Sequence, residues 1–171
     1  ASVRCAVSSG WPISVIEYLD TVIMPLLIGF MLFGRYHTGE NSMIHQTLVL
    51  TALQQIVANP EHQPELIAKL FSPHYRQAVD GHTLDYPQFI QHMALLKQIT
   101  CSMQLQILAI AAAGENVFTH HWVNVEKRDG SQCQIRVLAH FIVRDGQIQS
   151  CVELTQLLAG EHQDRDLGSR R

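Results

Sequence analysis

The sequence lacks the cysteine and histidine spacings that mark a metal centre or a redox centre. Its four cysteines form no CxxC pair; they are Cys5, Cys101, Cys133 and Cys151. Its ten histidines contain neither an HxH nor an HExxH spacing, and the adjacent His120 and His121 would point to opposite faces of a strand. We therefore expect no metal, no cofactor, and a reduced, cytoplasmic protein.

An excess of charge of one sign is also missing. Lys and Arg total 12, Asp and Glu total 15, and the formal net charge is −3. The basic residues are scattered, apart from the terminal Arg170-Arg171, so the charge pattern does not favour nucleic acid as a partner. With 171 residues, 47% of them hydrophobic, the chain is long enough for one globular domain with a real core.

A long hydrophobic run is absent as well. The apolar run Thr21–Phe33 has thirteen residues, whereas a membrane-spanning helix needs about 20. Glu17 and Asp20 precede it, which is unlike a secretory signal. Three interpretations stay open: a weak membrane anchor, an extra helix packed on the domain or on a partner, or sequence outside the functional unit with translation starting at Met43. We favour the last, because a helical pattern begins just after Met43, and we treat residues 1–42 as an N-terminal extension without a membrane role.

Downstream of Met43 the sequence predicts three helices and then strands. The helices are expected from Ile44 to Val57, from Pro64 to Leu70, and after Asp85, which would be an N-cap. Residues 71–81 are expected to form a loop with a short strand. Four strands follow, at about 100–112, 116–127, 132–143 and 147–157. The domain would thus cover residues 43–158, followed by a polar tail over 159–171. The tail is expected to be irregular, or alternatively ordered across a dimer or over a cavity mouth.

Two Asp-Gly turns, Asp129-Gly130 and Asp145-Gly146, join the last three strands into a meander. A two-residue type I′ turn at each would pair Arg128 with Ser131, and Arg144 with Gln147. Counting outward from these pairs assigns the side chains of the sheet to two faces. One face would carry a pocket-like set; its members are Thr119, His121, Val123, Arg136, Leu138, His140, Gln149, Cys151, Glu153 and Thr155. The other would carry an aromatic and aliphatic set; its members include Phe118, Trp122 and Phe141. The same count separates Cys133 from Cys151.

Helices followed by an antiparallel meander predict an α+β fold. Three N-terminal helices would pack on one face of a curved, mainly antiparallel sheet and enclose a cavity.

The chain resembles the nuclear transport factor 2-like superfamily, and within it the SnoaL-like proteins. The resemblance lies in the order of elements from Met43 to Leu157, in F-x-x-H-Y-x-Q-x-x-D-G at Phe71–Gly81, and in HFIVRDGQIQSCVELTQLL at His140–Leu158. It implies a cone-shaped fold in which Cys151, Glu153 and Thr155 point into the cone. It does not name a reaction, because the superfamily contains isomerases, cyclases, dehydratases, hydrolases and non-catalytic modules.

Glu153 and His140 are the first candidates for catalysis. A carboxylate beside an imidazole in an apolar cavity is how a general acid or base is tuned, and Arg136 or His121 would stabilise an oxyanion. The alternative is a buried network that is internally paired and purely structural. Asp80 has two interpretations: a third catalytic candidate, because relatives carry a carboxylate at the cavity mouth, or an ordinary Asp-Gly turn. The candidates for ligand binding are His121, Arg136, Tyr75, His92 and Cys151. The chain lacks the complete Asp/Tyr/Asp set of the steroid isomerases, so that reaction is not carried over.

Two functions follow as alternatives. The first is a SnoaL-like domain that binds a small apolar ligand, with acid–base chemistry of the isomerase, cyclase or dehydratase type. The second is a non-catalytic interaction or assembly module that uses the outer aromatic sheet face. In either case a face with Phe118, Trp122 and Phe141 exposed is expected to form a homodimer.

Overall fold

The computed structural model describes residues 41–170. The chain divides into two units, residues 1–39 and 40–171, and all of the described residues belong to the second. The expectations for the N-terminal extension, including the run Thr21–Phe33, lie outside the described residues. Within residues 41–170 no helix is long and apolar enough to cross a membrane.

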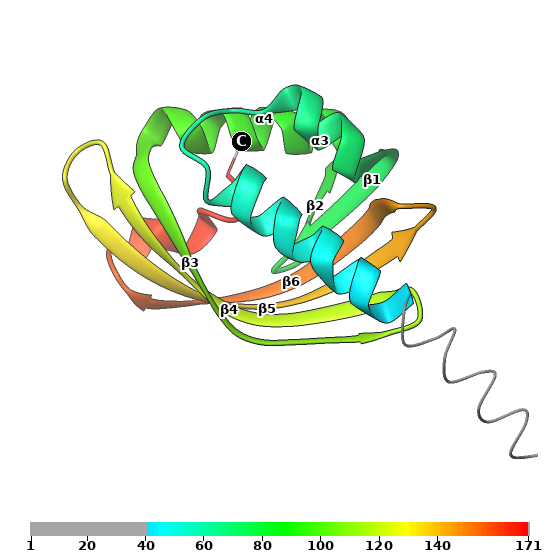
Figure 1. The fold of residues 1–171 in the computed structure, drawn as a ribbon. Coiled ribbons are helices and arrows are strands. Elements are labelled where there is room, and N and C mark those ends of the chain that lie inside the picture. The colour runs from blue at the N-terminus through cyan, green and yellow to red at the C-terminus, as the bar shows by residue number, and fades with distance from the viewer. Residues whose placement is uncertain (1–40, 171) are drawn as a thin grey trace, which may run out of the picture. The chain divides into compact units, whose positions relative to one another are not determined.

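Two helical segments precede the first strand and a third lies between the second and third strands. All three lie on one side of the sheet (Figure 1). The first covers residues 41–52 and continues into the π-helical segment η2, Leu53–Val57. It is followed by α3, Pro64–Leu70, and α4, Tyr86–Ile99.

The sheet has six strands in the order β2-β1-β6-β5-β4-β3. Their bounds are β1 Phe71–Val79, β2 His82–Asp85, β3 Thr100–Ala113, β4 Asn116–Lys127, β5 Gln132–Arg144 and β6 Gln147–Ala159. Only β1 and β6 pair in parallel; the other neighbours are antiparallel. The sheet curves around the helices, which confirms the expected α+β arrangement (Figure 1).

Helix α4 begins where the sequence predicts. Asp85 accepts a hydrogen bond from the backbone N–H of Gln88 over 3.0 Å, and the Gln88 side chain accepts one from the Asp85 N–H over 3.0 Å. This capping box satisfies donors that the first turn leaves unpaired, and Pro87 in the same turn has no N–H to satisfy. The start of α4 fixes which of its side chains face the sheet, and His92 is among those buried.

Two regions are more ordered than the sequence suggests. Residues 71–79 form a full strand, and β2 follows after a tight turn at Asp80-Gly81, both with positive φ (49° and 86°). The tail contains the 3-10 helix η3, His162–Asp166, and Asp164 within it is completely buried. The irregular tail was therefore the wrong alternative.

The turn at Asp129-Gly130 is not type I′, and this shifts β5 by one residue against β4. Gly130 has a positive φ of 84° and Asp129 does not. Lys127 N–H donates to the Ser131 carbonyl over 2.9 Å, and Gly130 N–H donates to the Lys127 carbonyl over 3.0 Å. These bonds define a three-residue loop, a type I turn followed by a left-handed glycine. The predicted pairing of Arg128 with Ser131 was wrong.

The turn at Asp145-Gly146 does form as predicted, with φ of 53° and 73° and with Arg144 opposite Gln147. The pairing slips by one residue immediately afterwards, where Gln149 is skipped as β6 pairs with β5. A single skipped residue is a β-bulge, and it transfers all later side chains of the strand to the other face.

The two slips together turn β5 over relative to the prediction. Phe141 lies on the inner face, toward the helices, and is only 4% exposed, so its assignment to an outer interface was wrong. Arg136 and His140 lie on the outer face, so their predicted place in the pocket was wrong. Cys133 and Cys151 are both buried on the inner face, so the prediction that they lie on opposite faces was also wrong.

Candidate functional site

A cavity of about 110 Å³ lies between the helices and the inner face of the sheet. Its wall is mainly aliphatic and aromatic, and it includes Phe71, Phe89 and Phe141. The polar side chains in the wall are Tyr75, Gln77, His92, His121, Glu153 and Thr155. No Lys or Arg is among the described residues that line it. The cavity therefore suits a small, largely apolar molecule without a negative charge.

A chain of hydrogen bonds runs along the cavity wall from Tyr75 to Glu153 and ends at Cys151, behind Glu153. The Tyr75 hydroxyl donates to Oε1 of Gln77, and Nε2 of Gln77 donates to Oε1 of Glu153, each over 3.3 Å. The Cys151 thiol donates to the same Glu153 oxygen over 3.3 Å. Tyr75 and Gln77 share a face because they are two apart on β1, and Cys151 and Glu153 share one on β6. The two strands are parallel neighbours, so these pairs meet.

Glu153 is the carboxyl group in the cavity wall. Burial raises the pKa of Glu153 to about 7; the Cys151 thiol opposes the shift by donating to the carboxylate, and the charge of Asp80 adds to it. Part of the Glu153 side chain remains accessible, as expected for a group that lines a cavity. A carboxyl with a pKa near neutrality can both accept and return a proton.

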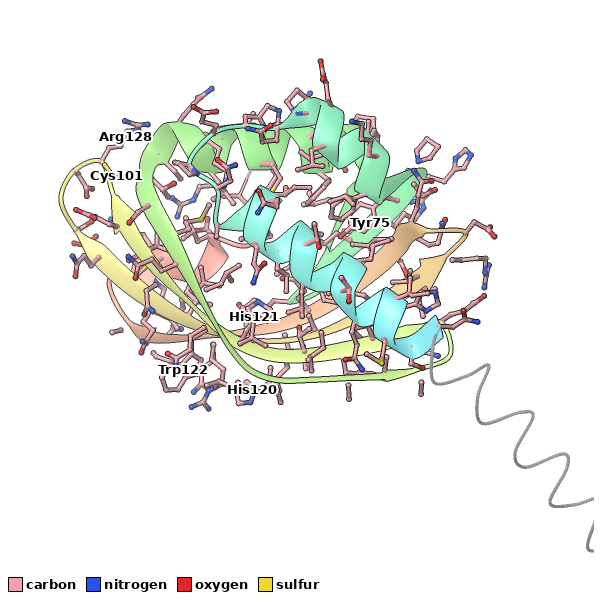
Figure 2. All side chains as sticks on the ribbon, viewed as in Figure 1. Tyr75, Cys101, His120, His121, Trp122 and Arg128 are labelled. Carbon is pink, nitrogen blue, oxygen red and sulfur yellow. The ribbon has the colours of Figure 1, made fainter. Side chains whose placement is uncertain are left out.

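His121 of β4 is a neutral imidazole in the same wall. It is 3% exposed, and burial, together with the charge of His120, lowers the pKa of His121 to about 4. Its Nδ1 is 3.1 Å from the Thr119 hydroxyl, while Nε2 has no hydrogen-bond partner within residues 41–170. Figure 2 shows His121 on the helix side of the sheet, and His120 and Trp122 on the opposite side.

His92 of α4 is the second imidazole of the wall. Its side chain is 3% exposed, and Nδ1 lies 2.6 Å from the backbone carbonyl oxygen of Arg170 in the tail. Burial lowers the pKa of His92 below its ordinary value; the bond to Arg170 opposes this shift and the charge of Lys97 adds to it. His92 is therefore uncharged at neutral pH.

The structure thus brings together Tyr75, His92, His121 and Glu153 among the residues that the sequence proposed. Cys151 is 1% exposed and lies behind Glu153, where it contacts the carboxylate rather than the cavity.

Asp80 does not line this cavity. Its carboxylate accepts one hydrogen bond from the Thr155 backbone N–H over 2.9 Å and another from the Thr155 hydroxyl. Asp80 also forms the β1–β2 turn, which favours the turn interpretation, and it ties β1 to β6 beside Glu153.

His140 and Arg136 have partners of their own on the outer face. His140 Nε2 is 2.8 Å from the Asn116 side-chain oxygen, and its ring stacks on Phe118 with ring centres 4.4 Å apart. Arg136 donates to the Gln156 side chain over 3.2 Å. Neither can reach Glu153 through the sheet.

Sequence reasoning missed Gln77, and it offered a tail over the cavity mouth only as an alternative, without naming the tail residues in the wall. Gln77 could have been found from its spacing of two from Tyr75 on a strand. Leu167 and Gly168 line the cavity although they belong to the polar tail, and the isolated apolar Leu167 is the signal that could have identified them. Within residues 41–170 no cluster of three or more His, Cys, Asp or Glu side chains is arranged to hold a metal.

No family model matches the chain. An uncharacterised protein of the fission yeast Schizosaccharomyces pombe is 32% identical over 105 residues, which are 61% of this chain and 81% of that protein.

Solved structures with a similar fold share little sequence with the chain. A protein of Jannaschia sp. CCS1 assigned as a SnoaL-like polyketide cyclase is 13% identical, with a TM-score of 0.60 over 68% of this chain and 88% of the other. An LEH-like epoxide hydrolase of M. tuberculosis is 16% identical, with a TM-score of 0.55 over 67% of this chain and 84% of the other. A Streptomyces galilaeus protein assigned as a hydroxylase is 13% identical, with a TM-score of 0.59 over 74% and 86%. At these identities the likeness concerns the fold.

Proposed function

Because the chain belongs to the family of the fission yeast protein and has the SnoaL-like fold of the nuclear transport factor 2-like superfamily, we propose that its cavity binds a small apolar molecule and that Glu153 exchanges a proton with it. The observation that carries the proposal is the carboxyl of Glu153, with a pKa of about 7, in the wall of a mainly apolar cavity. The reactions of the solved neighbours are not transferred to this chain.

The proposed chemistry is a proton transfer at carbon beside a carbonyl. The Glu153 carboxylate takes the proton, and the electron pair of the broken C–H bond passes into the substrate to give an enolate. If the Thr119 hydroxyl donates to Nδ1 of His121, the ring carries its proton on Nε2, which then donates to the enolate oxygen over the cavity. In a β,γ-unsaturated carbonyl compound the enolate extends over the C=C double bond to the γ carbon. Glu153 returns its proton to that carbon and the double bond moves into conjugation with the carbonyl, so the sum is an isomerisation without any co-reactant.

Native mass spectrometry of the full chain, purified from cell extract, tests ligand binding. The expected result is a small extra mass that is lost on denaturation. A Val137→Phe variant, which adds a ring at a cavity-lining position that is 5% exposed, should lose the adduct but remain folded. Identical spectra for both proteins, with no adduct in either and no thermal shift from apolar probes, would count against the proposal.

A second candidate function is assembly through the outer sheet face, and a homodimer is the partner we propose. The large apolar side chains exposed there include Phe118 at 48%, Leu138 at 50%, Val152 at 52% and Leu154 at 65%. Trp122 Nε1 and Arg136 Nε are buried on the same face but have no hydrogen-bond partner within residues 41–170. A second copy of the face would cover the apolar patch. The cytoplasmic location expected from the cysteine pattern stays a prediction.

A further inference from the structure

The C-terminal tail, residues 160–170, is built into the wall of the cavity. Its Leu167 is 3% exposed and lines the cavity together with Gly168. Gly168 packs so closely that a Cβ there would lie 3.1 Å from Cγ1 of Val79 and 3.8 Å from Cγ2 of Thr155. The tail therefore reaches the same part of β1 and β6 that carries Glu153.

A buried ion pair holds the tail in this place. Lys127 Nζ donates to Oδ1 of Asp164 over 2.8 Å, and the two side chains are only 8% and 1% exposed. The second carboxylate oxygen of Asp164 accepts a hydrogen bond from the Glu161 N–H over 2.9 Å. Gly160, at the start of the tail, has a φ of 130° and packs against Cys133. A Cβ at Gly160 would lie 2.5 Å from the Cys133 Cβ. These contacts fix the path of the chain up to Leu167.

The end of the tail determines which nitrogen of His92 carries the proton. The carbonyl oxygen of Arg170 can only accept a hydrogen bond, so Nδ1 of His92, 2.6 Å away, must donate. In a neutral imidazole the other nitrogen is then an acceptor. Nε2 of His92 has no partner within residues 41–170, although the ring lines the cavity.

We propose that His92 is the hydrogen-bond acceptor for a hydroxyl group of a neutral, single-ring ligand, and that the Arg170 carbonyl is the positioning group that makes it one. This inference rests on the proposed function, since it describes a ligand of the same cavity. Three observations set the ligand class: an acceptor nitrogen that needs a donor, no Lys or Arg among the described wall residues to pair with an anion, and a cavity of about 110 Å³. A dry protein cavity of roughly 150 Å³ is known to hold benzene, so one ring is the appropriate size.

The first experiment requires no variant. ¹⁵N NMR of the imidazole side chains in the full chain shows which nitrogen of each neutral histidine is protonated. The expected result is the Nδ1–H form for His92. The Nε2–H form, which is the commoner one in water, would overturn the proposal whatever the ligand is.

The second experiment uses phenol and toluene as probes, which differ in the hydroxyl group. Replacing His92 by Leu should lower the ratio of phenol affinity to toluene affinity about tenfold, because the buried hydroxyl of phenol would then lack its hydrogen-bond partner. His92→Gln retains an acceptor oxygen, so its ratio of phenol affinity to toluene affinity should stay close to that of the wild type. His74→Leu, at an exposed histidine of β1, is the matched control and should leave it unchanged.

The outcomes separate the two proposals. Loss of the ratio in His92→Leu, with toluene still bound and rescue in His92→Gln, supports a hydroxyl acceptor at His92. An unchanged ratio in His92→Leu overturns this role but leaves the cavity as a binding site. Failure of both phenol and toluene to bind the wild-type chain overturns the proposed function and, with it, the ligand class inferred here.

Discussion

Nε2 of Gln77 donates a hydrogen bond to Oε1 of Glu153 over 3.3 Å, across the parallel pair β1 and β6. The amide has one orientation available, because its own Oε1 accepts the Tyr75 hydroxyl. Within residues 41–170 no cation forms an ion pair with Glu153. A buried carboxyl held by neutral donors loses less on protonation than one in an ion pair, so Glu153 can change its charge near neutral pH.

Replacing Glu153 by Gln should change how stability depends on pH. The pKa of Glu153 is raised from 4.5 to about 7 in the folded chain, so between these values the folded chain binds a proton that the unfolded chain has lost. The free energy of unfolding contributed by Glu153 therefore falls as pH rises from 4.5 to 7, by up to about 3 kcal/mol. Urea unfolding should show that the stability of Glu153→Gln relative to the wild type is higher at pH 8 than at pH 5. A constant difference between the two proteins would contradict the expectation.

His121 should give the opposite dependence. The pKa of His121 is lowered from 6.5 to about 4, so between these values the unfolded chain binds a proton that the folded chain does not. Stability contributed by this residue is present above pH 6.5 and is lost as pH falls toward 4, by up to about 3 kcal/mol. A His121→Asn variant should therefore lose less stability than the wild type between pH 7 and pH 4.5. Parallel curves for the two proteins would show that His121 is not held neutral.

Gly160→Ala should be far more damaging than Gly114→Ala. Both glycines have a positive φ, 130° at Gly160 and 59° at Gly114, and L residues disfavour positive φ. At Gly114, in the left-handed region, the cost for an L residue is about 1–2 kcal/mol. A Cβ at Gly114 would meet nothing within 4 Å, whereas at Gly160 it would overlap Cys133 and Asp164. We expect a small loss of Tm for the control and a larger one for Gly160→Ala, with the ¹⁵N signal of His92 altered only in the latter. Equal losses would mean that Gly160 does not hold the tail in place.

Leu154→Asp tests the outer face as a dimer interface. Leu154 is 65% exposed on β6, so a charge there should leave the fold of the monomer intact while opposing burial between two copies. Sedimentation velocity should show dimerisation weakened by about tenfold or more, which corresponds to at least ~1.4 kcal/mol. Ile44→Asp, at an exposed residue of the first helix, is the control. A wild-type chain that is monomeric at micromolar concentration would refute the dimer outright.

The order of helices and strands was predictable, because short stretches of sequence determine where these elements begin and end. Asp85 and Pro87 marked the start of α4, and alternating strands after Thr100 marked the meander. The pairing of Arg144 with Gln147 was also correct, because nothing outside the Asp145-Gly146 turn alters it.

The register of β5 could not be predicted, because an Asp-Gly pair allows two kinds of turn. Glycine takes positive φ in both a type I′ turn and a type I turn with a bulge; only the φ of the preceding Asp differs. Contacts with α4 favour the second kind here. Arg128 donates from its backbone N–H to the Ile99 carbonyl over 3.0 Å and from its guanidinium to the Lys97 carbonyl over 3.2 Å. These residues are about thirty positions away in the sequence, so no local pattern reveals them.

The candidate site was predicted only where the register did not matter. His121 and Glu153 were placed correctly on the inner face, because two slips of one residue cancel between β4 and β6. Arg136 and His140 were misplaced because β5 lies between the two slips. The role of the tail at His92 depends on a contact between residues 78 positions apart, which the sequence does not reveal.

The measurement that tests the central claim most directly is a ¹³C NMR titration of the Glu153 carboxyl in the full chain, with and without toluene. We expect titration near pH 7 in the free protein, and at a higher pH with toluene bound, because a ligand that displaces water from the cavity further disfavours the carboxylate. Titration near the ordinary value of 4.5, unaffected by toluene, would show that Glu153 does not line a ligand cavity and would contradict the account.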